Sequence, residues 1–198
     1  MNNLNYQNVI FFDLLTTGLS FNSDIAEIAA IDAISGDTFV QKIFFYDDEA
    51  DFEILEKFGY NQKLWRKEGV EPEVALRRFS DFCLNHSTQV AISKQGKEYP
   101  IAVLAGFNVC DFDKPILVKA HKRYNIFFPF DYRCYDIMHL AFWRYAGRAT
   151  YSLDALCELE GIKKENSALS NAIACFKLAQ KILAKPLRFE KLNWSKQS

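Results

Sequence analysis

The chain has 198 residues and a formal net charge of −1, and 49% of its residues are hydrophobic. This composition fits one globular domain over residues 1–198 and excludes an intrinsically disordered chain. The near-zero charge excludes the overall basic surface of a protein that coats nucleic acid. It still allows a site that binds the end of one strand.

The cysteines and the N-terminus indicate a compartment rather than a metal site. The five cysteines are scattered, form no CxxC pair and have no histidines clustered near them, so zinc is not expected. The odd number, with no basic and apolar leader in residues 1–8, indicates a reducing cytoplasm. The longest apolar runs are too short to span a bilayer, so no membrane partner is expected.

The first third of the chain predicts three strands. Residues 8–13 (NVIFFD) form a continuous apolar run that ends on a carboxylate, which is typical of a strand buried on both faces. Residues 25–33 and 38–45 predict a second and a third strand, separated by the turn Ser35-Gly36-Asp37. Short turns between consecutive strands predict an antiparallel meander.

The middle of the chain predicts a helix between polar segments. The acidic run at 47–51 is interpreted as a solvated loop or a helix start. Glu71-Pro72-Glu73 opens a helix, and residues 86–100 predict a loop or an edge hairpin. The helix has apolar residues at helical spacing, namely Ala75, Leu76, Phe79, Phe82 and Cys83.

The last part of the chain predicts one strand and four helices. The strand covers 101–107, and helices follow at about 112–124, 135–145, 152–160 and 168–183. The last helix is predicted to bury a stripe formed by Leu169, Ala172, Ile173, Phe176, Ala179, Ile182 and Leu183.

This order of elements predicts the fold class. A meander followed by a helix, a strand and further helices predicts an α/β, ribonuclease-H-like three-layer fold, with a mixed sheet and helices on both of its faces. The core is expected over about 8–183, and the polar, basic segment 184–198 is expected to be a tail.

Three ordered blocks of sequence carry a family resemblance. Residues 13–19 read DLLTTGL, residues 106–117 read GFNVCDFDKPIL, and residues 166–172 read NSALSNA after the segment YSLDALCELEGI. In this order they resemble the three motifs of DnaQ-like (DEDD) 3′–5′ exonucleases. In that family, four carboxylates hold two divalent metal ions and a histidine activates the attacking water.

The resemblance fails at three of the five positions that carry this chemistry. Leu15 stands where the family has Glu, Asn166 where it has His, and Asn171 where it has Asp. The resemblance implies that Asp13 and Asp113 are retained metal-binding positions for Mg²⁺ or Mn²⁺. Hard cations prefer anionic oxygen ligands, so with two carboxylates lost a metal is expected to bind weakly or not at all.

The same departures bear on catalysis. Asn166 has no titrating group and cannot act as a general base, a loss that typically costs about 10²–10⁴-fold in rate. The Tyr132–Asp136 segment (YRCYD) fits a variant third motif but lies at the wrong place in the chain. Efficient two-metal hydrolysis is therefore not expected.

The resemblance also implies positions for nucleic-acid binding. The loop that approaches the terminal nucleotide and the second block match at Thr16, Thr17, Gly18, Leu19, Asn108 and Phe112. The alternative for the loop is an ordinary turn. The alternative for Asp113 and Asp136 is that each is a carboxylate at the start of a helix. Leu15 is expected to pack with Leu14 or Leu19, and both asparagines to satisfy the start of the last helix.

Basic residues gather in the second half of the chain. They could follow a strand backbone beside stacking aromatic rings, or they could form a solvated helix face. These residues are Lys114, Lys119, Lys122, Arg123 and Arg133.

Three functional hypotheses remain open from the sequence. The first is a degenerate exonuclease that binds a single-stranded nucleic-acid end or serves as a scaffold. The second is a weak or rearranged metal-dependent exonuclease that uses Asp13 and Asp113. The third is a protein-interaction domain that binds a protein partner through an apolar former cleft.

Overall fold

The computed structural model describes residues 9–46 and 50–184, and its central element is a mixed six-stranded sheet. The strand order is β3-β2-β1-β5-β4, and β6 also pairs with β5. The strands are β1 (Val9–Thr16), β2 (Ile25–Asp32), β3 (Thr38–Lys42), β4 (Gln89–Ile92), β5 (Glu98–Gly106) and β6 (Phe130–Asp136).

The predicted antiparallel meander is confirmed. β1 pairs antiparallel with β2, and β2 pairs antiparallel with β3. The register places Leu15 opposite Glu27. β3 ends at Lys42 rather than at residue 45, because Ile43 leaves the strand and forms an isolated bridge with Val70.

The second half of the sheet is mostly parallel. β1 pairs parallel with β5, and β5 pairs parallel with β6. The carboxyl ends of these three strands therefore meet at one edge of the sheet, where α/β folds commonly place their binding sites. β4 pairs antiparallel with the beginning of β5, which confirms the edge-hairpin alternative for residues 86–100.

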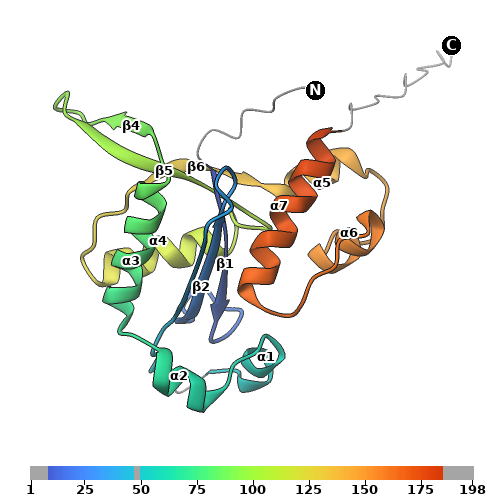
Figure 1. Cartoon of the computed structure of the whole chain (residues 1–198), viewed down its shortest axis with the longest axis horizontal. Helices are drawn as coiled ribbons and strands as arrows, with labels where there is room; N and C mark the ends of the chain where they lie inside the picture. Colours follow the sequence, from blue (N-terminus) through green and yellow to red (C-terminus); the bar gives the residue numbers. More distant parts are fainter. Residues whose placement is uncertain (1–8, 47–49, 185–198) are drawn as a thin grey trace, which may run out of the picture.

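Seven helices are described between Phe52 and Ala184, and they form layers on both faces of the sheet (Figure 1). α3 and α4 pack on one face, α5, α6 and α7 cover the other, and α1 and α2 lie beyond the ends of β1 and β2. Among these described helices, none combines the length and the hydropathy needed to cross a membrane. Their bounds are α1 (Phe52–Lys57), α2 (Gln62–Glu68), α3 (Pro72–Asn85), α4 (Asp113–Arg123), α5 (Ile137–Arg144), α6 (Leu153–Glu160) and α7 (Ala168–Ala184).

The sequence prediction missed α1 and α2, which are short and capped by polar side chains. The Asp51 carboxylate accepts a hydrogen bond from the Ile54 amide, so the acidic run ends in a helix start. Residues 47–49 lie outside the described residues. Both helices bury one apolar side chain, Leu55 and Trp65, and the Trp65 indole donates to the Ala26 carbonyl at 2.9 Å.

The buried stripe of α7 differs from the predicted one. Ala172, Ala179 and Ile182 are buried as predicted, but Leu183 is 40% exposed. Ala174, Cys175 and Leu178 are buried as well, because α7 packs against both the sheet and α6 over a wider arc than one narrow stripe. Ala184 ends α7, and the rest of the predicted tail, residues 185–198, lies outside the described residues.

The strand β6 was not predicted, and the helix expected from Tyr135 begins at Ile137 instead. The boundary is set by Asp136, whose buried carboxylate accepts hydrogen bonds from three backbone amides. The donors are Met138 at 2.9 Å in α5, and Asn108 and Cys110 at 3.1 Å in the loop after β5. Its prediction as a helix-start carboxylate is confirmed, and it also fixes a loop on the neighbouring strand.

We expect Asp136→Ala to lower the free energy of unfolding by about 1–3 kcal/mol, because it leaves buried backbone donors without an acceptor. Chemical unfolding in urea measures this difference. Asp111→Ala, at an exposed aspartate in the same loop, is the matched control and should change the stability little. Equal stabilities of the two variants would contradict the structural role of Asp136.

Candidate functional site

A cavity of about 200 Å³ lies at the carboxyl end of β1. Its walls come from β1 and the loop after it, from α1, from the loop that joins β5 to α4, and from the first turns of α4 and α7. The lining residues are Asp13, Leu14, Leu15, Thr16, Leu19, Ile54, Phe58, Phe107, Asn108, Phe112, Asp113, Ala168 and Asn171.

Most of the residues predicted for the site line this cavity. They are Asp13, Leu15, Thr16, Leu19, Asn108, Phe112, Asp113 and Asn171. Thr17, Gly18 and Asn166 are not part of the lining. Thr17 is fully buried, and its hydroxyl accepts a hydrogen bond from the Asp24 amide at 3.0 Å; Asn166 is exposed ahead of α7.

Two carboxyl groups, from Asp13 and Asp113, lie on the wall of the cavity. Asp13 is on β1 and Asp113 is in the first turn of α4, where its Oδ1 accepts a hydrogen bond from the Leu14 amide at 3.0 Å. Burial raises the pKa of Asp13 to about 7. Burial, and then the neighbouring Asp13, raise the pKa of Asp113 well above its usual range. The pair therefore carries less than two negative charges at neutral pH.

Asn171 joins this pair to a lysine. Its Nδ2 donates to Asp13 Oδ2 at 3.2 Å, and its Oδ1 accepts from the Lys164 ammonium at 3.0 Å. An ammonium can only donate hydrogen bonds, so Lys164 fixes which end of the amide faces Asp13. The expectation that Asn171 satisfies the start of the last helix is wrong, since the Ser170 amide there donates to the Ser167 hydroxyl.

Lys164 lies beside the cavity, and the sequence prediction missed it together with the lining residues Ile54, Phe58, Phe107 and Ala168. The Lys164 side chain is only 10% exposed, and its ammonium also pairs with the Asp154 carboxylate at 2.8 Å. The positive charge of Lys164 acts against the effect of burial and lowers the pKa of Asp13. The sequence signal that could have revealed Lys164 is its position two residues before Asn166, the first residue of the third matched block.

Leu15 packs mainly against α1, α2 and β2. It is 5% exposed and lies in an apolar cluster with Ala26, Leu55 and Trp65. Leu14 belongs to a different cluster because successive side chains of a strand point to opposite faces. Leu14, Leu15 and Leu19 nevertheless all line the cavity, so this part of the wall is apolar as expected.

Glu27 does not replace the carboxylate that Leu15 lacks. It pairs with Leu15 across the strands but is not part of the cavity lining. The Lys42 ammonium lies 3.8 Å from its carboxylate and 3.1 Å from that of Glu68. Burial raises the pKa of Glu27.

The donor set of the cavity does not fit a pair of divalent cations. Within residues 9–46 and 50–184 there is no group of three or more His, Cys, Asp or Glu side chains that could hold a metal ion. The cavity offers two carboxyl groups, and the amide oxygen of Asn171 is engaged by Lys164. Paired hard cations need several anionic oxygens to offset their mutual repulsion.

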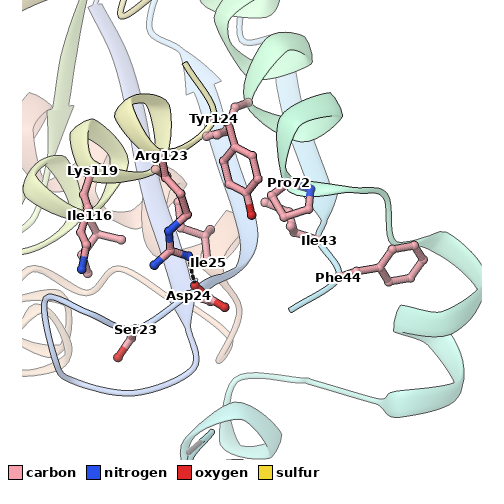
Figure 2. A pocket seen from close by; sticks show the side chains of 12 residues that line it. Ser23, Asp24, Ile25, Ile43, Phe44, Pro72, Ile116, Lys119, Arg123 and Tyr124 are labelled. Carbon is pink, nitrogen blue, oxygen red and sulfur yellow. Dashed lines mark hydrogen bonds and ion pairs between the residues drawn. The ribbon is translucent and has the colours of Figure 1, made fainter. Parts of the chain in front are cut away.

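A second cavity, between β2, α3 and α4, is too small for a nucleotide (Figure 2). Its volume is about 30 Å³, which is space for one or two water molecules. Arg123 on its wall forms an ion pair with Asp24 at 2.5 Å, and Lys119 donates to Asn22. Arg133 likewise pairs with Asp131 at 2.9 Å. These members of the predicted basic cluster are thus held by partners in the chain.

The sheet and its helical layers form a ribonuclease-H-like fold. No protein-family model matches the chain, and no curated protein sequence matches it. The comparison with solved structures therefore carries the fold assignment. It confirms the fold class that the sequence predicted.

Structures of exonuclease I are similar to this chain. Exonuclease I of E. coli in complex with a dT13 oligonucleotide has a TM-score of 0.68 and 18% sequence identity, over 91% of this chain and 41% of that chain. A zinc-bound complex of E. coli exonuclease I with single-stranded DNA has a TM-score of 0.71 and 17% sequence identity, over 90% of this chain and 41% of that chain. Exonuclease I of Methylocaldum szegediense has a TM-score of 0.68 and 18% sequence identity, over 89% of this chain and 41% of that chain. The chain spans about two fifths of these exonuclease chains.

The raised pKa of Asp13 predicts that stability falls with rising pH. A carboxyl group whose pKa is raised by folding stabilises the fold fully below its unfolded pKa, near 3.8, and this contribution is lost as the pH rises through about 7. In the presence of EDTA, the free energy of unfolding should fall by more than about 1 kcal/mol between pH 5 and pH 8.5 relative to Asp13→Asn.

Urea unfolding at several pH values measures this difference. Asp81→Asn, at an exposed aspartate of α3, is the control and should show the same pH dependence as the native chain. If native and Asp13→Asn proteins respond identically to pH, the cavity does not perturb this carboxyl group.

Proposed function

We propose that this chain is a degenerate exonuclease that binds the end of a single-stranded nucleic acid in the 200 Å³ cavity without efficiently cutting it. The observation that carries the proposal is the arrangement around Asn171, whose amide lies between the Asp13 carboxyl and the Lys164 ammonium. A protein cation thus supplies positive charge at a place where the family, by resemblance, uses metal ions.

The electrostatics of the cavity favour phosphate binding. Four ionised carboxylates without metal ions would repel a phosphodiester strongly, whereas this cavity keeps two carboxyl groups of raised pKa. The Lys164 ammonium, which also pairs with Asp154, adds a positive charge next to Asn171. The affinity is expected to fall as salt rises, since phosphate contacts release counterions.

The walls of the cavity provide aromatic surface for bases. Phe107 and Phe112 are half-buried on the lining, and Phe112 also faces the exposed ring of Phe21 at a centroid distance of 6.5 Å. Base stacking on aromatic rings contributes about 1–3 kcal/mol per base and tolerates any sequence. The binding of a dT13 oligonucleotide by E. coli exonuclease I, whose fold this chain shares, supports the same class of ligand.

Inefficient cleavage follows from the groups that the cavity lacks. Asn166 is exposed, is not part of the lining and has no titrating group to activate water. The lining residues include no histidine. Among the described residues that line the cavity, only Asp13 and Asp113 offer a side-chain carboxyl group to Mg²⁺ or Mn²⁺, so the ion would be weakly held.

A second candidate function is supported by the apolar part of the lining. Leu14, Leu15, Leu19, Ile54 and Phe58 contribute to the cavity. An apolar cavity of this kind favours a peptide or subunit side chain as the occupant. This alternative makes the chain a protein-interaction domain, and its binding would be insensitive to nucleic acid.

We expect end-labelled single-stranded DNA or RNA to bind the full chain in EDTA, and Phe112→Ala to weaken binding by about 5–100-fold through loss of stacking. Fluorescence anisotropy measures the affinity. Phe127→Ala is the control, because Phe127 is an exposed ring that packs on Tyr99 rather than lining the cavity.

This binding assay, a cleavage assay on the same labelled strands and a co-purification experiment together separate the three hypotheses. Absence of binding to both nucleic acids contradicts the proposal. Trimming of the labelled strand in Mn²⁺ that disappears in Asp13→Asn would establish a rearranged nuclease. Co-purification of a stable partner that nucleic acid does not displace would favour the protein-interaction domain.

A further inference from the structure

Two cysteines meet beside the cavity. The sulfur atoms of Cys110, in the loop after β5, and Cys134, on β6, lie 2.7 Å apart. A disulfide bond is about 2.0 Å long, so only a small movement separates the thiol pair from a covalent bond. We infer that Cys110 and Cys134 are a site of reversible disulfide formation that fastens the loop forming one wall of the cavity.

The other cysteines of the chain do not compete for this reaction. Cys83, Cys157 and Cys175 are buried, so a reagent in solution does not reach their thiols in the folded chain. Cys110 and Cys134 are both partly exposed. Thiol oxidation follows exposure, so selectivity for this pair follows from the fold.

The bond would reinforce a contact that already positions the loop. The Cys110 amide donates to Asp136 Oδ2, and the Asn108 amide donates to Oδ1 of the same carboxylate. Asn108 has a φ of 59°, a left-handed conformation that is uncommon for a residue other than glycine. Phe107, Asn108 and Phe112 from this loop line the cavity, so the disulfide would hold one of its walls against β6.

The oxidant in the proposed reaction is a low-molecular-weight disulfide. One thiolate of the pair attacks one sulfur of the reagent and releases one small thiol, which leaves a mixed disulfide on that cysteine. The other thiolate then attacks the cysteine sulfur of this mixed disulfide, forms the protein disulfide and releases the second small thiol. Two protein thiols are oxidised, and one small disulfide is reduced to two thiols that take up the two protein thiol protons.

The surroundings of Cys110 set the conditions for the reaction. Burial, and then a hydrogen bond with Cys134, raise the pKa of the Cys110 thiol to about 12. The thiolate of Cys110 is therefore scarce at neutral pH, and mildly alkaline conditions should speed the reaction.

The test treats the full-length chain with glutathione disulfide at mildly alkaline pH, then alkylates the remaining thiols and maps the peptides by mass spectrometry. We expect a Cys110–Cys134 bond, with Cys83, Cys157 and Cys175 alkylated after unfolding. The midpoint of thermal unfolding should rise by roughly 5–10 °C, and dithiothreitol should reverse the rise. Cys110→Ser/Cys134→Ser should show no rise.

Single variants test whether both thiols are needed. Cys110→Ser and Cys134→Ser should each form at most a mixed disulfide and should show no reversible rise in the unfolding midpoint. The inference is overturned if the treated native chain keeps both thiols free, or if the bonds involve the buried cysteines. The assay uses no nucleic acid, so its failure would leave the proposed binding function untouched.

Discussion

The structure depends on how two carboxyl groups are kept together beside a buried strand. The second half of β1 carries Asp13, and α4 places Asp113 beside it. Burying two like charges together is unfavourable, so part of the charge must be removed or balanced. Here the raised pKa values remove part of the charge, and Lys164 balances part of the rest through Asn171. The loop geometry at Asp136 and the first turn of α7 keep these groups in place.

The sequence predicted the strands and helices whose apolar pattern is strong. The meander, α3, α4 and α6 all have buried residues at the expected spacing, and Gly161 ends α6 with a φ of 65°. The sequence prediction missed α1 and α2, which bury only one side chain each. It also missed β6, where the apolar side chain of Tyr132 is exposed and breaks the apolar pattern of a strand. In these segments tertiary contacts, rather than local periodicity, determine the structure.

For the site, the sequence predicted which residues meet but not how they bond. Eight of the predicted residues line one cavity, although they come from β1 and the loop after it, from the loop before α4 and its first turn, and from α7. The contacts of Leu15 and Asn171 could not be predicted, because they depend on α1, α2 and Lys164, for which the family motif has no position. A substitution in a motif shows which functional group is lost. The contacts that the new side chain makes are visible only in the structure.

The most direct test of this account measures Mn²⁺ binding by electron paramagnetic resonance. It compares the native chain, Leu15→Glu/Asn171→Asp, and the same double variant with Lys164→Met added, after circular dichroism confirms folding. If Lys164 supplies charge in place of a metal ion, the native chain binds weakly and the Lys164→Met variant binds at least about tenfold more tightly than the double variant, the equivalent of about 1.4 kcal/mol. Tight binding of two ions by the native chain, or no effect of Lys164→Met, would contradict the account.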